Sequence, residues 1–150
     1  MLRIAKLTDY ATVVMSQMAH MPQRQVSAQQ LAQELGLPTP TVAVLLKKLT
    51  RAGLVVSARG VGGGYRLARD PKAISVAQVI RAIEGPVALT QCALGDGACA
   101  LEAECATRGN WRLISHAVEV ALEAVSLAEM AMPVTHTVRL EALRRHGTHQ

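Results

Sequence analysis

The fold is decided by residues 27–68, which read SAQQLAQELGLPTPTVAVLLKKLTRAGLVVSARGVGGGYRLA. Ser27 and Gln30 have the spacing of a capping box, in which each side chain accepts a hydrogen bond from the other residue's backbone N–H. A helix is therefore predicted to begin at Ser27. Gly36 is predicted to end it, because glycine readily adopts the left-handed conformation found after helix ends.

A second helix is predicted over residues 41–52. Thr39 is a favourable N-cap residue, and Pro40 suits the first helical position, where its missing N–H costs nothing. Four apolar residues recur at helical spacing and are expected to face inward: Val42, Leu45, Leu46 and Leu49. Two short helices joined by a short turn are typical of a helix-turn-helix.

Beyond this helix the pattern changes to that of two short strands, predicted over residues 54–57 and 65–68. The connection between them contains Arg59 and four glycines within residues 58–64. This glycine-rich segment lacks the Lys and Ser or Thr of a P-loop, and Tyr65 stands where a dinucleotide-binding motif has its last glycine. The pattern instead indicates a hairpin next to a helix-turn-helix, which is the wing of a winged helix.

Double-stranded DNA is the predicted partner of these elements. Residues near the start of the second helix are expected to reach bases or phosphates, basic side chains to contact phosphates, and the wing to place Arg59 in a minor groove. The candidate DNA-binding residues are Ser27, Ala28, Thr39, Thr41, Val42, Lys47, Lys48, Arg51, Arg59, Gly62, Gly63 and Tyr65. The alternative is a three-helix core with a solvated basic face and a merely flexible hairpin loop.

Two further helices flank this region. One is predicted over residues 8–21, with Thr8 as its cap and Asp9 in its first turn. The other begins with a capping box at Ser75 and runs to Glu84.

A long helix is predicted over residues 110–132, where apolar residues repeat at three- and four-residue spacing. A helix of roughly 20 residues spans about 30 Å, which exceeds what a small domain needs for its own core. Its apolar, alanine-rich face is therefore expected to pack against a second copy of the chain, giving a homodimer.

The charge of the 150-residue chain is divided unevenly. Its formal net charge is +5, but residues 1–84 carry 11 Lys and Arg against 4 Asp and Glu, whereas residues 85–150 carry 5 against 7. The basic half is thus the one suited to DNA. With no Phe, one Trp and two Tyr, the composition argues against a base-stacking binder of single strands. Neither a signal peptide nor a membrane-spanning segment is predicted, so we expect a cytoplasmic protein without a membrane partner.

All three cysteines, Cys92, Cys99 and Cys105, lie in a segment without clear periodicity, which is predicted to be a loop. An odd count in a cytoplasmic chain disfavours structural disulfides. Three thiolates on a flexible loop can bind one face of an iron–sulfur cluster. Zinc is the main competitor, because soft thiolates select both metals. Unligated redox-sensing thiols and buried structural cysteines are the remaining alternatives.

Several motifs occur together in this chain: LTDYA at 7–11, GLV at 53–55, RGVGGGYRL at 59–67, IEG at 83–85, the three cysteines, and Trp111. With them, roughly residues 1–132 resemble the iron–sulfur-sensing winged-helix repressors, the family of IscR and NsrR, and in particular the branch that regulates the SUF cluster-assembly operon. The resemblance implies a homodimer with crossed C-terminal helices and one cluster in each protomer. It favours a [2Fe–2S] over a [4Fe–4S] cluster, and implies that occupancy changes DNA affinity or site preference.

One position departs from the IscR pattern. A His follows the third cysteine by three residues there, whereas this chain has Arg108, so the fourth ligand is open. Asp9 from the other protomer is a candidate, as in NsrR-like relatives. Glu102, Glu104 and His116 are others, and an external thiol or a water molecule can also complete the shell.

The predicted fold class is mainly α with a small β-hairpin. A winged helix-turn-helix domain (1–85) is followed by a cysteine-containing cluster loop (86–109), a dimerisation helix (110–132) and a flexible tail (133–150). The predicted function is a DNA-binding regulator, a repressor, controlled by a cluster and acting on cluster-assembly genes. The alternatives are a zinc- or thiol-based regulator and a redox or cluster-transfer protein that does not bind DNA. No motif places a nucleophile beside a base, so an enzyme is not expected.

Overall fold

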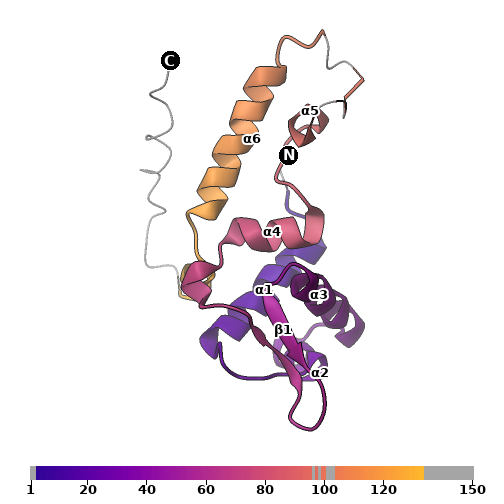
Figure 1. The fold of residues 1–150 in the computed structure, drawn as a ribbon, viewed down its shortest axis with the longest axis vertical. Coiled ribbons are helices and arrows are strands. Elements are labelled where there is room, and N and C mark those ends of the chain that lie inside the picture. The colour runs from indigo at the N-terminus through magenta and orange to yellow at the C-terminus, as the bar shows by residue number, and fades with distance from the viewer. Residues whose placement is uncertain (1–2, 96, 98, 101–103, 134–150) are drawn as a thin grey trace.

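The computed structural model describes residues 3–95, 97, 99–100 and 104–133. In chain order its elements are α1 (Lys6–His20), α2 (Ala28–Leu35), α3 (Thr39–Arg51), β1 (Val55–Ala58), β2 (Gly64–Leu67), the 3-10 helix η1 (Pro71–Ala73), α4 (Val76–Glu84), α5 (Gln91–Leu94), α6 (Arg108–Glu123) and α7 (Leu127–Met130) (Figure 1). This part of the chain is mainly helical with one two-stranded antiparallel sheet, which confirms the predicted fold class in outline. Residues 134–150 of the predicted tail, and Glu102, lie outside the described residues.

The helix-turn-helix forms as its sequence predicts. Ser27 Oγ accepts a hydrogen bond from the Gln30 N–H at 3.1 Å, and Gln30 Oε1 accepts one from the Ser27 N–H at 2.8 Å. Gly36 ends α2 in the left-handed conformation, with φ of 65°. The predicted apolar stripe of α3 is buried and forms the centre of the core: Val42, Leu45, Leu46 and Leu49.

The start of α3 differs from the prediction. Thr39 was expected to cap a helix beginning at residue 41, but it is itself the first helical residue, after an extended Pro38. No side chain caps this end. Pro40 fits in the first turn because its missing N–H has no intrahelical partner there in any case.

The start of α1 differs for a long-range reason. The helix begins at Lys6, two residues before the predicted cap, and the Thr8 side chain is buried. The Thr8 hydroxyl donates a hydrogen bond to the Glu84 carboxylate, and the backbone N–H of Ala5 donates another to Glu84 Oε1 at 3.2 Å. A carboxylate at the end of α4 therefore caps α1 from across the fold.

The wing pairs along its full predicted length, with both strands displaced by one residue. Val55 lies opposite Leu67, and Ala58 lies opposite Gly64. Outside the hairpin, Val26 and Tyr65 exchange two backbone hydrogen bonds of 2.9 and 2.8 Å. The wing is thereby attached to the residue that precedes Ser27, the N-cap of α2.

Helix α4 packs against α1, α3 and α6 and is the central connection of the fold. Arg81 of α4 forms ion pairs with two residues of α6, Glu119 at 3.0 Å and Glu123 at 2.7 Å. Figure 1 shows α6 extending away from the helical body with α5 beside it. None of the helices in the described ranges is long and apolar enough to cross a membrane.

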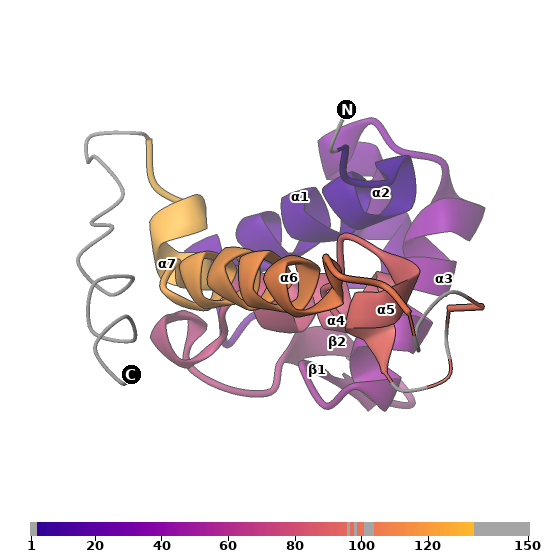
Figure 2. The ribbon, with the colours of Figure 1, turned by 90° about the horizontal axis from the view of Figure 1, so that it is seen from above.

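The single helix predicted over residues 110–132 is divided. Helix α6 ends at Glu123, and α7 begins after a capping box in which Ser126 Oγ accepts from the Glu129 N–H at 3.2 Å. Leu127 is 1% exposed and belongs to the same core as α1 to α4. Figure 2 shows α7 and α5 at opposite ends of α6. The last turn of the predicted dimerisation helix is therefore part of the helix-turn-helix domain's core.

Candidate nucleic-acid interface and cysteine segment

The outward face of α3 carries several of the predicted DNA contacts. Thr39, Lys47 and Arg51 are exposed, and Thr41 is half-buried. Lys47 and Arg51 are four residues apart and therefore share one face of the helix. Because α3 contains no acidic residue, this face presents uncompensated cations of the kind that bind a phosphate backbone.

Two predicted contacts in α3 point into the protein instead. The Val42 side chain is 0% exposed, so the prediction that it reaches DNA is wrong: it packs in the core. Lys48 is half-buried, and its Nζ donates a hydrogen bond to the backbone carbonyl of Ile83 at 3.1 Å. Ile83 lies in the last turn of α4, where helix carbonyls lack internal partners. The ammonium expected to bind phosphate thus joins α3 to α4.

Ser27 and Ala28 are half-buried at the start of α2. The Ser27 hydroxyl oxygen already accepts the capping hydrogen bond of that helix. Tyr65 is half-buried in β2, and its side chain packs against the core. The Val26–Tyr65 pairing brings these three predicted contacts together where the wing meets α2.

The turn of the wing exposes Arg59 and Gly62. At Gly63, an added Cβ atom would lie 2.5 Å from the Ala58 carbonyl oxygen and 2.8 Å from that of Gly60. The hairpin itself therefore requires glycine at position 63, whether or not DNA approaches it.

The three cysteines lie in different environments. Cys92 is buried on the short helix α5, which forms inside the segment predicted to be a loop, whereas Cys99 and Cys105 are half-buried and none of the three is in a disulfide. Within the described ranges, no three His, Cys, Asp or Glu side chains are close enough together to bind a metal ion. The structure does not bring the predicted ligands together.

The segment around Cys92 is held against α6. Arg112 donates a hydrogen bond from Nε to the Cys92 carbonyl at 3.1 Å, and the buried Ser115 hydroxyl accepts one from the Leu89 N–H at 3.1 Å. Sequence reasoning missed Arg112 and Ser115 because these partners are 20 and 26 residues apart. A polar residue within the apolar pattern of the long helix was the one local signal of such a contact.

Cys105 carries the clearest electrostatic perturbation in this segment. Hydrogen bonds from the Thr107 side chain and backbone hold the pKa of its thiol below the ordinary value, with smaller contributions from the Arg108 backbone and charge. The Sγ atom lies 3.4 Å from Thr107 Oγ1. A lowered pKa increases the fraction of thiolate, which is the form that binds metals and reacts with oxidants.

Among the candidates for a fourth ligand, Asp9, Glu104 and His116 are all exposed. Asp9 lies in the first turn of α1, where a carboxylate also interacts favourably with the helix dipole. Its described hydrogen bond is made by the backbone, whose carbonyl accepts from the Thr12 hydroxyl at 2.7 Å. The Asp9 side chain is thus accessible to a ligand or a second protomer.

The chemistry of the donors fits a thiophilic metal centre. Three thiols outside any disulfide lie within fourteen residues, and the pKa of one of them, Cys105, is lowered by its hydrogen bonds with Thr107. Such a set suits iron–sulfur clusters and zinc alike. Assembly of a site would require Cys99 and Cys105 to approach the fixed Cys92.

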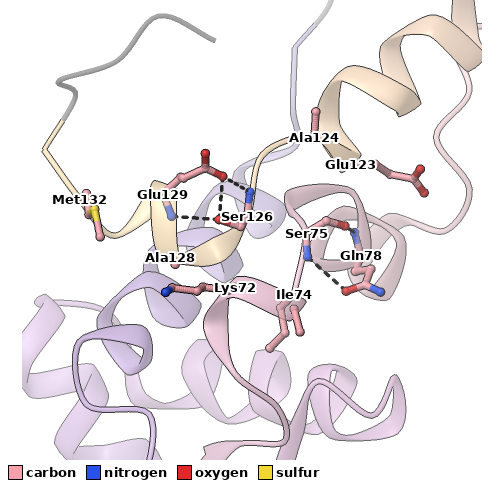
Figure 3. Close-up of a pocket in the computed structure, with 11 residues that line it drawn as sticks. Lys72, Ile74, Ser75, Gln78, Glu123, Ala124, Ser126, Ala128, Glu129 and Met132 are labelled. Carbon is pink, nitrogen blue, oxygen red and sulfur yellow. Dashed lines mark hydrogen bonds between the residues drawn. The ribbon is translucent and has the colours of Figure 1, made fainter. Parts of the chain in front are cut away.

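A separate cavity of about 590 Å³ lies where α7 meets η1 and α4. Figure 3 shows the capping boxes of α4 and α7 on its wall, Ser75 with Gln78 and Ser126 with Glu129. These polar groups form hydrogen bonds within their own capping boxes. The cavity therefore lies between the first turns of two helices, α4 and α7. It coincides with neither the outward face of α3 nor the cysteines.

Comparison with known proteins shows which family shares this sequence. Residues 4–133 match the Rrf2 family, described as iron-dependent transcriptional regulators. The regulator IscR of Vibrio cholerae is 36% identical over 132 residues, which cover 87% of this chain and 76% of the relative.

Two solved structures share the fold. CymR, the global cysteine regulator of B. subtilis, has a TM-score of 0.69 at 32% identity, covering 87% of this chain and 97% of that one. T. potens IscR has a TM-score of 0.68 at 29% identity, covering 91% and 93%. These relatives are named as regulators and not as enzymes, in agreement with the sequence prediction. The chain belongs to the Rrf2 family of transcriptional regulators.

Proposed function

We propose that this chain represses transcription by binding double-stranded DNA as a homodimer, with an affinity controlled by an iron–sulfur cluster held by Cys92, Cys99 and Cys105. The outward face of α3 and the wing bind the duplex. Lys47, Arg51 and other basic groups contact phosphates, so the affinity falls steeply with salt.

The observation that carries this proposal is a continuous chain of polar contacts from the cysteine segment to α3. Arg112 and Ser115 hold the Cys92 segment on α6. The two ion pairs of Arg81 hold α6 on α4, and Lys48 holds the end of α4 on α3. A rearrangement of the cysteine segment on loading therefore has a physical route to the DNA-binding helix.

The homodimer is supported by the exposed apolar side chains of α6. Trp111 and Ile114 lie three residues apart on one face of α6 and are both exposed, and Leu113 is exposed on another side of the helix. A helix that extends from its domain with such a face is suited to pack against its own copy. In a dimer, the separation of the two α3 helices would have to match two half-sites on DNA.

The cysteine thiolates would hold the cluster, [2Fe–2S] in preference to [4Fe–4S], with Asp9 of the second protomer as the fourth ligand. The bound group supplies one-electron redox chemistry and sensitivity to oxidants. This chain's own residues position Cys92 and promote ionisation of Cys105. By its resemblance to the SUF-system branch, the regulated genes would be those of iron–sulfur cluster assembly, and the protein would act in the cytoplasm.

The test is anaerobic purification of the full chain, followed by visible spectroscopy, iron and sulfide analysis, and titration of duplex DNA before and after metal removal. We expect charge-transfer bands, stoichiometric iron and sulfide, and a changed DNA affinity on removal. Individual Cys92→Ser, Cys99→Ser and Cys105→Ser variants should each lose the bands. Zinc alone, or an affinity independent of the metal, contradicts the cluster part of the proposal.

The second candidate is a zinc- or thiol-based regulator with the same DNA-binding surface. The lowered pKa of Cys105 favours it, because a thiolate is also the reactive form in direct redox sensing. A colourless protein whose DNA affinity responds to oxidant or to zinc would support this candidate. The third alternative, a redox or transfer protein that does not bind DNA, is disfavoured by membership of a family of transcriptional regulators.

A further inference from the structure

The outward face of α3 contains an exposed apolar patch that the basic residues do not explain. Val44 is 49% exposed, and Ala43 beside it is exposed as well. They lie on the side of α3 opposite the buried Leu45 and Leu46. Val42, Leu45, Leu46 and Leu49 are fully buried along one side of α3. Val44 is exposed because the helical repeat places it on the other side.

The first half of α3 lacks the side chains that read bases by paired hydrogen bonds. Between residues 39 and 46 there is no Arg, Lys, Asn or Gln, and the only side-chain hydrogen-bonding groups are the hydroxyls of Thr39 and Thr41. Lys47 and Arg51 come only in the second half. Bidentate recognition of guanine by Arg or Lys and of adenine by Asn or Gln is therefore absent where a recognition helix approaches the bases.

We infer that Ala43 and Val44 read thymine through its 5-methyl group in the major groove, which makes Val44 a specificity-determining residue; this inference rests on the proposed function. The methyl group is the one apolar feature that a base pair presents in that groove, and small apolar side chains contact it. Thymine is thus the base whose recognition needs no hydrogen bond from the first half of α3.

A protein partner is the other conceivable occupant of this patch, and the surroundings disfavour it. Lys47 and Arg51 follow Val44 on the outward side, and α3 has no carboxylate to balance them. A stable protein interface usually takes about 800 Å² from each partner, far more than Ala43 and Val44 offer. An apolar patch with cations beside it is complementary to DNA, where the edge of a base lies between phosphates.

The test uses the full chain, purified anaerobically and assayed both as isolated and after metal removal. Bound sequences are selected from a pool of random-sequence duplex DNA, and each selected thymine is then replaced by deoxyuridine, which lacks only the methyl group. We expect one thymine position in each half-site where this replacement weakens binding by about fourfold, the value of one buried methyl. In Val44→Ala the discrimination between thymine and deoxyuridine at that position should fall to within twofold of unity.

Val13→Ala is the matched control, because Val13 is 40% exposed on α1 and outside the proposed DNA surface. It should keep the fourfold discrimination and the salt dependence of the unmodified chain. Deoxyuridine replacements without effect on the unmodified chain, or undiminished discrimination in Val44→Ala, overturn the inference and leave the proposed function standing. Failure to bind any duplex in a salt-dependent way overturns the proposed function and the inference with it.

Discussion

Lys48 of α3 and Ile83 of α4 are joined by a hydrogen bond of 3.1 Å between an ammonium and a backbone carbonyl, while the adjacent Lys47 is exposed. Neighbouring lysines on one helix therefore have different roles. Lys48 positions α3 on α4, and Lys47 is available to phosphate.

Replacing each lysine by methionine should separate these roles. Lys48→Met should lower the free energy of unfolding by about 1 kcal/mol, because a carbonyl loses a charged donor, and should leave the salt dependence of DNA binding unchanged. Lys47→Met should leave stability unchanged and reduce the salt slope by about 1. Chemical denaturation and salt-dependent titrations measure the two effects. Equal salt slopes for the two variants would argue against the assignment.

Leu127 tests whether α7 belongs to the core. Leu127→Ala should lower the free energy of unfolding by about 2–5 kcal/mol, since the side chain is 1% exposed among core residues. Leu113→Ala, on the same predicted helix but 68% exposed, should change it by no more than about 0.5 kcal/mol in the monomeric state. Denaturant titration compares them. A Leu127→Ala variant as stable as the unmodified chain would mean that α7 is not docked in solution.

Ser115 should control the accessibility of Cys92. Ser115→Ala leaves the Leu89 N–H without its partner, which costs about 1–3 kcal/mol locally and favours release of the segment from α6. Alkylation of Cys92 in the metal-free chain should therefore become faster, as followed by mass spectrometry of the labelled peptide. Asn110→Ala, an exposed change in the first turn of α6, serves as the control and should alkylate at the original rate.

Cys105 should ionise at lower pH than an ordinary cysteine. Hydrogen bonds from the Thr107 side chain and backbone favour its thiolate, so the pKa is lowered and the alkylation rate of metal-free Cys105 should reach half its maximum at lower pH than for a free thiol. Thr107→Val should raise this midpoint by removing the side-chain hydrogen bond. Site-resolved alkylation across a pH series measures both midpoints, and coincident curves would contradict the role of Thr107.

Arg81 should couple the cysteine segment to DNA affinity. Arg81→Gln removes both ion pairs between α4 and α6, each worth about 0.2–1 kcal/mol at such half-exposed positions. We expect the metal-free chain to keep its DNA affinity, while the difference between metal-loaded and metal-free states shrinks. Arg24→Gln removes a comparable half-exposed ion pair, that with Glu34 at 2.8 Å, without touching α6. An undiminished difference in Arg81→Gln would show that coupling takes another route.

Local patterns in the sequence predicted what neighbouring residues determine. The capping boxes at Ser27 and Ser75 and the buried stripe of α3 are confirmed because their partners lie within one or two turns. The contacts of Lys48 with Ile83 and of Thr8 with Glu84 join residues 35 and 76 positions apart, and no spacing rule reveals them.

The sequence contains a local signal for the break between α6 and α7, although the apolar repeat predicts one continuous helix. Ser126 and Glu129 have the spacing of a capping box, yet the apolar repeat continues through them and outweighed this local signal. The relative positions of the three cysteines could not be predicted from the sequence. Their irregular spacing on a Gly-rich segment is compatible with many backbone conformations.

Because Leu127 returns to the core, the DNA-binding domain is discontinuous in sequence. A fragment that stops after residue 85 would lack the side chain that fills this part of the core and would expose the apolar surface beneath it. A better minimal domain would replace residues 86–125 by a short linker, because Ser126 pairs with Ser75 before the start of α4 whereas residue 85 follows its end. Helix α4 has nine residues and is about 14 Å long, so a linker of roughly six residues would run back along it. The cysteine segment and α6 therefore form an insertion, and both of its ends are attached to the domain that contains α1 to α4. A conformational change within the insertion acts on that domain at both attachment points.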